Sequence, residues 1–184
     1  MKRLDCVWIA GASLVALALA PAARAALSPP TEGKVSFQAA GPAGMTIEGT
    51  TNEISLADQG EGVVITVPLG NLTTGISVRD RHMKEKYLEV AKYPTATLSV
   101  ARASLKLPAG GDKVEADVPG TVTIHGQTRP VTVHYDAKKD GESLAAHGKF
   151  HVNMHDFGIE VPSYLGVTVK PDIDVGATFR VADR

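Results

Sequence analysis

The sequence predicts an all-β protein, an eight-stranded antiparallel barrel with one short helix inserted between the third and fourth strands. Three observations predict this fold. Apolar and polar residues alternate along most of the chain, turn-forming residues separate the alternating segments, and only one segment has the spacing of a helix. Small sheets with sharp bends tend to close into barrels, because closure removes the exposed strand edges.

The first 25 residues have the three regions of a signal peptide. Lys2 and Arg3 form a basic start, an apolar stretch runs from Val7 to Leu19, and Ala23-Arg24-Ala25 is an A-x-A cleavage pattern. The apolar stretch is shorter than the roughly 20 residues that a membrane-spanning helix needs. We therefore expect residues 1–25 to be removed on export, and residues 26–184 to form one domain in the periplasm.

Cleavage would change the composition of the mature chain. Its net charge would become −3 instead of −1, because three basic residues and one acidic residue leave with the signal peptide. The only cysteine, Cys6, and the only tryptophan, Trp8, leave as well. This loss excludes a disulfide, a thiolate nucleophile and a cysteine metal site in the mature chain. A mildly acidic chain without a basic block gives no indication of nucleic-acid binding.

Eight segments show the alternation of half-buried strands, and it is clearest in the last of them. The predicted strands are Lys34–Ala39, Met45–Leu56, Val63–Leu69, Thr95–Leu107, Lys113–Ile124, Arg129–Ala137, Glu142–Asn153 and Val167–Val181. The second and fourth change phase midway, which predicts a β-bulge in each. Pro171 lies inside the last segment and predicts a bend or a break in pairing, because proline cannot donate to a ladder.

One segment has helical spacing. Ser77-Val78-Arg79-Asp80 fits the S-x-x-D capping pattern, and Met83, Tyr87 and Val90 follow at positions i, i+4 and i+7. These residues predict a helix from about Val78 to Val90. Tyr93-Pro94 would end it, because the residue before a proline avoids the helical region.

The turn between the sixth and seventh predicted strands predicts a specific strand register. Asp140-Gly141 is a favourable two-residue hairpin turn, and it aligns strand residues whose numbers sum to 281. In this register, His134 faces His147 on the outer side of the hairpin, at a distance where two imidazoles could share a metal ion. Two ligands on an exposed sheet are an incomplete site, so we predict no metal there.

Three stretches of the chain resemble the YceI-like family. They are Thr74-Gly75-Ile76-Ser77-Val78-Arg79-Asp80-Arg81-His82-Met83 with Lys92-Tyr93-Pro94-Thr95-Ala96, His125-Gly126-Gln127-Thr128-Arg129-Pro130-Val131-Thr132-Val133, and Asp156-Phe157-Gly158-Ile159. The resemblance implies a lipocalin-like barrel in the periplasm whose lumen holds a polyisoprenoid or similar long-chain lipid, and it is compatible with a homodimer. The chain departs from the family at Phe37-Gln38-Ala39, where a His-Gly is common, and at Asn153-Met154-His155, where an arginine is frequent.

The residues themselves favour an apolar lumen. The predicted inner face is rich in Val, Ile, Leu and Ala and has few aromatic rings to fill it. An exposed prenyl chain costs about 0.8 kcal/mol per methylene-sized group in water, so a long one needs a carrier. The alternative is a barrel that its own side chains fill. The predicted lumen residues are Phe37, Val63, Ile65, Val67, Val122, Ile124, Val131, Val133, Phe150, Val152, Val169 and Val175.

Arg79, His82 and Lys86 are the first candidates for binding a charged head group. They fall on one side of an ideal helix, near its N-terminus, where a phosphate or carboxylate would be stabilised. Arg129, in the predicted turn after His125-Gly126, is a further candidate. The alternative for each is a structural role: Asp80 would cap the helix, Arg79 would pair with a strand, and Arg129 would fix the hairpin.

Catalysis is weakly indicated. Ser163, His155 and Asp156 lie close in sequence, but no G-x-S-x-G or comparable nucleophile turn accompanies them. The six histidines lack the spacing of known metal motifs. We therefore predict a binding protein that needs no cofactor. A secreted hydrolase, and a barrel that serves as a protein-interaction or redox-partner module, are the alternatives.

Overall fold

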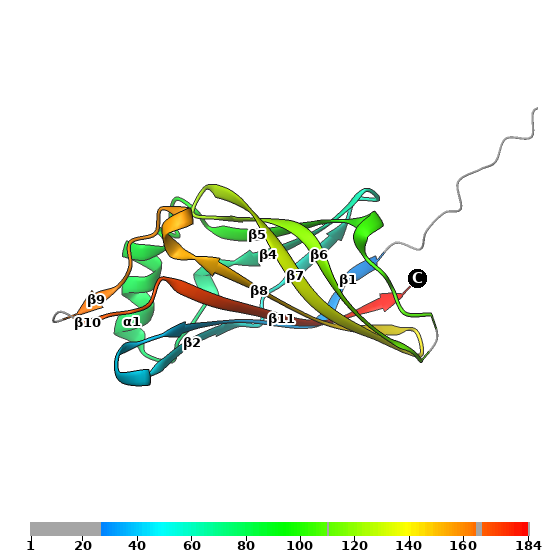
Figure 1. Ribbon diagram of the computed structural model, residues 1–184, viewed down its shortest axis with the longest axis horizontal. Coiled ribbons are helices and arrows are strands. Elements are labelled where there is room, and N and C mark those ends of the chain that lie inside the picture. Colours follow the sequence, from blue (N-terminus) through cyan, green and yellow to red (C-terminus); the bar gives the residue numbers. More distant parts are fainter. Residues whose placement is uncertain (1–26, 110, 165–166, 184) are drawn as a thin grey trace, which may run out of the picture.

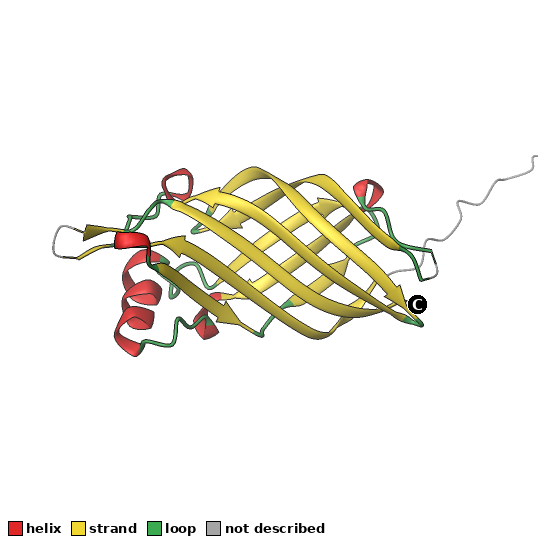
Figure 2. Cartoon of the chain, turned by 60° about the horizontal axis from the view of Figure 1, so that its bottom comes forward, coloured by secondary structure: helices red, strands yellow, loops and turns green. Residues whose placement is uncertain are grey.

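The computed structural model describes residues 27–109, 111–164 and 167–183, in which nine strands form one curled antiparallel sheet (Figures 1 and 2). The order of strands across the sheet is β2-β1-β11-β8-β7-β6-β5-β4-β3. The strands are β1 (Leu27–Ala40), β2 (Thr46–Thr51), β3 (Ser55–Asp58), β4 (Gly62–Pro68), β5 (Thr95–Ala101), β6 (Lys113–Ile124), β7 (Gln127–Asp140), β8 (Ser143–Asn153) and β11 (Asp172–Asp183). The predicted all-β class is confirmed, but the sheet is a nine-stranded half-barrel instead of a closed eight-stranded barrel.

The additional strand comes from the predicted segment Met45–Leu56. Its first part, β2, pairs with β1, and its second part, β3, pairs with β4. The change of phase in this segment is therefore not a bulge. It marks residues 52–54, where the chain passes from one edge strand of the sheet, β2, to the other edge strand, β3. Cα atoms of β1 and β3 approach within 8 Å, although no strand pairing joins these two strands among the described residues.

Two other predicted strands are shorter than expected. The segment Thr95–Leu107 ends as a strand at Ala101, because the chain then turns through the 3₁₀ helix η4 (Arg102–Ser104). The change of phase in this segment therefore marks the end of β5 and not a bulge. The last predicted strand is interrupted at Pro171, as the proline indicated. Before it, β9 (Ser163–Tyr164) and β10 (Val167–Thr168) form a separate small hairpin.

The predicted helical segment lies between β4 and β5, after the short 3₁₀ helix η2 (Leu69–Asn71). It combines α1 (Ser77–His82) with the π-helical turn η3 (Met83–Tyr87). The predicted cap is wrong, because Ile76 is the N-cap residue and no side chain caps it. Asp80 instead turns back to the preceding loop, where it accepts hydrogen bonds from Thr73 Oγ1 (2.6 Å) and Thr74 N (2.7 Å).

The β7–β8 hairpin has the predicted faces in a different register. Paired residues sum to 283, because the turn residues are Gly141 and Glu142, and Gly141 alone of these two has a positive φ, of 60°. A shift of two residues leaves every side chain on its own face. It moves the histidines apart, however: His134 lies opposite Lys149, and His147 lies opposite Asp136. The predicted histidine pair is therefore wrong.

A buried carboxylate, Asp58, links β3 to β1 across the sheet and also forms an ion pair with Arg102. Asp58, at the end of β3, accepts hydrogen bonds from Leu27 N at the start of β1 (3.0 Å) and from Arg102 Nε (3.2 Å). The Asp58 and Arg102 side chains are only 4% and 6% exposed. The hydrogen bond from Leu27 lowers the pKa of Asp58, and Gly60 N–H and Arg102 act in the same direction, against the effect of burial.

We expect Asp58→Asn to destabilise the fold by about 3 kcal/mol, because it leaves the Arg102 charge buried without its counter-charge. Urea unfolding at neutral pH measures this difference. The exposed Asp112→Asn is the matched control and should change stability little.

The same pair gives a pH dependence. Because the pKa of Asp58 is lower in the folded state, its stabilising contribution is present above the ordinary Asp pKa and is lost as the pH falls through the folded value. The acid limb of the stability curve should therefore be shallower in Asp58→Asn. Equal unfolding midpoints for Asp58→Asn and the wild type at neutral pH would contradict this role.

Candidate functional site

The interior of the curled sheet is continuous and apolar. One core cluster surrounds buried residues such as Val133 and Leu144, and the other surrounds Val152 and Phe157 near the α1 end. Leu98, Val131 and Phe150 pack against both clusters. The two clusters therefore form one apolar interior along the length of the sheet.

A cavity of about 90 Å³ lies within the first cluster. Inner residues of β1, of β3 to β8 and of β11 line it, and the surface exposed to it is apolar. Val63, Ile65, Val133 and Phe150, which were predicted as lumen residues, are among its lining residues. The interior is thus apolar and already contains unfilled space.

The structure places the predicted lumen residues inside. Ten belong to the two clusters or pack against them: Val63, Ile65, Val122, Ile124, Val131, Val133, Phe150, Val152, Val169 and Val175. The other two, Phe37 and Val67, are half-buried on the same face; Phe37 lies opposite Val175 in the ladder of β1 and β11. Their contact with a ligand stays a prediction.

Sequence reasoning missed a loop, the one after η4, that covers one end of the interior. Leu105 and Leu107, predicted as strand residues, belong to the loop after η4 and line the cavity. Tyr135 holds this loop, because its hydroxyl donates to Lys106 O (2.9 Å) and accepts from Lys106 N (2.7 Å). The phase change at Leu105 was the only available signal, and it does not distinguish a bulge from a loop.

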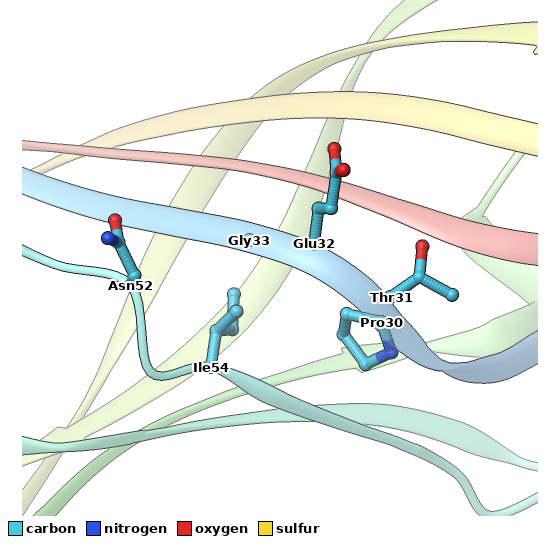
Figure 3. Close-up of a pocket in the computed structure, with 6 residues that line it drawn as sticks. All are labelled: Pro30, Thr31, Glu32, Gly33, Asn52 and Ile54. Carbon is cyan, nitrogen blue, oxygen red and sulfur yellow. The ribbon is translucent and has the colours of Figure 1, made fainter.

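A larger hollow of about 430 Å³ lies in the wall, between β1 and the segment that joins β2 to β3 (Figure 3). Polar residues such as Glu32 and Asn52 contribute to its lining, which makes it less suited to a lipid chain than the apolar interior. Ile54 points toward Gly33 here, and a Cβ at Gly33 would overlap its Cγ2. This contact packs the wall where β1 and β3 are not paired.

Three of the motif segments meet at His125. Its Nε2 lies 2.7 Å from Glu89 Oε2, its Nδ1 lies 3.1 Å from Phe157 O, and its ring centroid is 4.5 Å from that of Tyr93. His125 and Glu89 both adopt positive φ, 51° and 43°, which is uncommon outside glycine. The motif residues therefore join the helical segment, the β6–β7 turn and η5 (Met154–Phe157) at the α1 end.

The structure does not bring the four head-group candidates together. Arg79 is half-buried and donates to Thr74 Oγ1 (2.7 Å) and Thr74 O (2.8 Å), so its guanidinium holds the loop before α1. Lys86 pairs with Glu160 at 3.3 Å, and His82 is exposed. Arg129 is exposed and donates to its neighbour Thr128 O (2.9 Å). No hydrogen bond or ion pair connects any two of these four residues.

Other chemistry has little support in the described part of the chain. His155, Asp156 and Ser163 are exposed, and no hydrogen bond joins them within the described residues. No group of three or more metal-binding side chains is present in the ranges that the structure covers. In the same ranges, no helix has the length and apolar character needed to cross a membrane.

Comparison with known proteins agrees with this geometry. Residues 28–181 match the YceI-like domain. The chain belongs to this family. A "UPF0312 protein" of Pseudomonas savastanoi pv. phaseolicola is 29% identical over 133 residues, which are 68% of this chain and 67% of that protein. A "UPF0312 protein" of Pseudomonas fluorescens is 32% identical over 120 residues, 61% of this chain and 60% of the relative.

Solved structures share the YceI-like fold. A polyisoprenoid binding domain from Saccharophagus degradans, implicated in plant cell wall breakdown, superimposes with a TM-score of 0.70 at 16% identity and covers 86% of this chain and 98% of that one. BcnA from Burkholderia cenocepacia gives a TM-score of 0.65 at 20% identity over 80% and 95% of the two chains. At such identities, the likeness shows the fold alone.

The inner face can be tested with two neighbouring substitutions in β7. Val133→Asp should cost several kcal/mol, because it buries a carboxylate without a partner, whereas Thr132→Asp places the same charge on the exposed face. Thermal or urea unfolding measures both. Similar stability of the two variants would contradict the assignment of the faces.

Tyr135→Phe should remove about 1 kcal/mol of stability, because it leaves the two Lys106 backbone groups without their hydroxyl partner. The amide hydrogen of Lys106 should exchange faster, while those of β7 remain protected. Tyr87→Phe, which removes a hydroxyl at the other end of the interior, serves as the control. Unchanged exchange at Lys106 would show that the hydroxyl does not hold the cover.

Proposed function

We propose that this protein is a periplasmic carrier that holds a polyisoprenoid or similar long-chain lipid in the apolar interior of the half-barrel. The observation that carries the proposal is the continuous apolar interior, with a cavity that apolar surface alone lines. The family membership and the polyisoprenoid binding domain with the same fold support it. The export pattern at residues 1–25 supports the periplasmic location.

Binding requires the interior to widen. Ligand pockets usually measure about 300–1,000 Å³, and the cavity here has about 90 Å³. The side chains that would move are present: Ile65, Leu98 and Phe150 face the cavity and are only half-buried. The wall can also yield between β1 and β3, because side chains rather than ladder hydrogen bonds hold this part of the sheet. A chain can therefore enter without the loss of strand pairing.

A charged head group would remain outside the apolar interior. Arg79 is unsuited to bind it, because its hydrogen bonds already hold Thr74. Lys86, His82 and Arg129 are exposed and remain the candidates for a phosphate. The hydrolase alternative is not favoured, since the three residues that suggested it are not joined. A homodimer stays a prediction.

Filling the cavity tests the proposed lumen directly. Ala146 lines the cavity, whereas its neighbour Ala145 lies on the opposite face of β8. We expect Ala146→Phe to abolish the binding of a polyprenol and Ala145→Phe to preserve it. Overpacking costs about 1–3 kcal/mol, so circular dichroism must show that both variants are folded.

The measurement is native mass spectrometry of protein exported in cells, before and after incubation with an uncharged polyprenol. The wild type should carry a lipid adduct that organic extraction removes. The mass of the protein should correspond to a chain that begins at Ala26. Binding by folded Ala146→Phe as strong as that of the wild type would exclude the interior as the site.

A further inference from the structure

The exposed large apolar side chains gather at one end of the molecule. In the described residues they are Met45, Ile76 and Val78, which are 54%, 53% and 56% exposed. Met45 follows the 3₁₀ helix η1 (Pro42–Gly44), and the other two lie at the start of α1. Both η1 and α1 lie at the same end of the sheet, opposite the end that carries the C-terminus (Figures 1 and 2).

The helical segment at this end presents an excess of positive charge. Residues 77–92 contain Arg79, Arg81, Lys84, Lys86 and Lys92 against three acidic residues, in a chain whose net charge is −1. Two of the three acids are engaged within the protein: Asp80 by Thr73 and Thr74, and Glu89 by His125. Of the five cations, Arg79 is held by Thr74 and Lys86 pairs with Glu160, so Arg81, Lys84 and Lys92 carry the excess.

Apolar and basic side chains share the outer side of α1. Val78 and Arg81 are three residues apart, which places them on the same face of the helix, and both are exposed. Apolar side chains that enter the head-group region of a bilayer, next to cations that attract anionic lipids, are typical of proteins that lie on a membrane surface.

We propose that the α1 end of this protein docks on the surface of an anionic lipid bilayer. Ile76, Val78 and Met45 enter the head-group layer, while Arg81 and Lys84 contact the lipid phosphates. A protein partner with an apolar groove is less suited to this end, because Met45 follows η1 while Ile76 and Val78 lie at the start of α1, so the three side chains form no single helical ridge. The proposal goes beyond lipid carriage, since a surface contact needs no ligand in the interior.

The His125 cluster makes this end suitable for docking. Glu89, Tyr93 and Phe157 all contact His125, so the segment after α1 is tied to the β6–β7 turn and to η5. A docked α1 therefore fixes the orientation of the whole sheet, with Tyr87 and Leu88, which pack against the second apolar cluster, close to the lipid.

The test is co-sedimentation of the full protein with vesicles of phosphatidylcholine alone or mixed with phosphatidylglycerol, at about 10 mM and about 150 mM salt. Between these concentrations the Debye length falls from about 30 to about 8 Å. We expect binding to the mixed vesicles only, and at least tenfold weaker binding at the higher salt. Arg81→Glu, and separately Ile76→Ser with Val78→Ser, should each weaken binding at least tenfold.

Lys138→Glu is the matched control, because Lys138 is exposed near the other end of β7, and it should bind as the wild type does. Equal weakening by Lys138→Glu and Arg81→Glu would show nonspecific attraction and overturn the proposal. Wild-type protein that stays in the supernatant with mixed vesicles at low salt would overturn the proposal as well. This holds even if the apolar variant is found to lose a protein partner. Since the vesicles contain no polyprenol, these outcomes are separate from a failure of lipid carriage.

Discussion

The buried carboxylate of Asp58 is the interaction on which the shape of the sheet most depends. It connects the first residue of β1, the last residue of β3 and Arg102 at the end of β5, which belong to opposite ends of the sheet order. No strand ladder joins β1 to β3 in the described residues, so side chains must hold this part of the curl. Ile54 against Gly33 is the second contact of this kind.

A wall held by side chains has consequences for the interior. Opening a ladder would expose paired backbone groups, and each unsatisfied group costs free energy when buried. Separating β1 from β3 displaces packing contacts only, apart from the hydrogen bond from Leu27 N to Asp58. The rest of the sheet is a continuous ladder from β2 through β1 and β11 to β3. If the half-barrel widens around a lipid, the gap between β1 and β3 is where widening is least costly.

The sequence predicts which residues face inward better than it predicts which residues lie opposite each other. Alternation is a local property, so it places Val133 and Phe150 on the inner face whatever the register. The register of β7 and β8 depends on which two residues form the turn, and Gly141-Glu142 took the place of Asp140-Gly141. A phase change is also ambiguous: between β2 and β3 it marks a change of partner strand, and after β5 it marks a loop.

The apolar interior of the candidate site could be predicted from the sequence, whereas the roles of its polar residues could not. The apolar interior follows from alternation, whereas each polar role depends on contacts that spacing does not reveal. Arg79 has the position of a ligand-binding residue in a helix, yet Thr74, five residues earlier, takes its hydrogen bonds. His125 lies 32 residues from Phe157 and 36 from Glu89, so no local pattern predicts their contact.

The two ends of the interior differ in how they can move. At the cavity end, a loop held through one tyrosine hydroxyl covers the interior, and beside the same cavity Leu27 is the residue at which Asp58 links β1 to β3. At the α1 end, His125 joins three segments, and both His125 and Glu89 have a positive φ, which is uncommon outside glycine. An α1 end tied together by His125 and a wall held by side chains are complementary: the first can hold the protein on a surface, and the second lets the interior change volume while that contact stays in place.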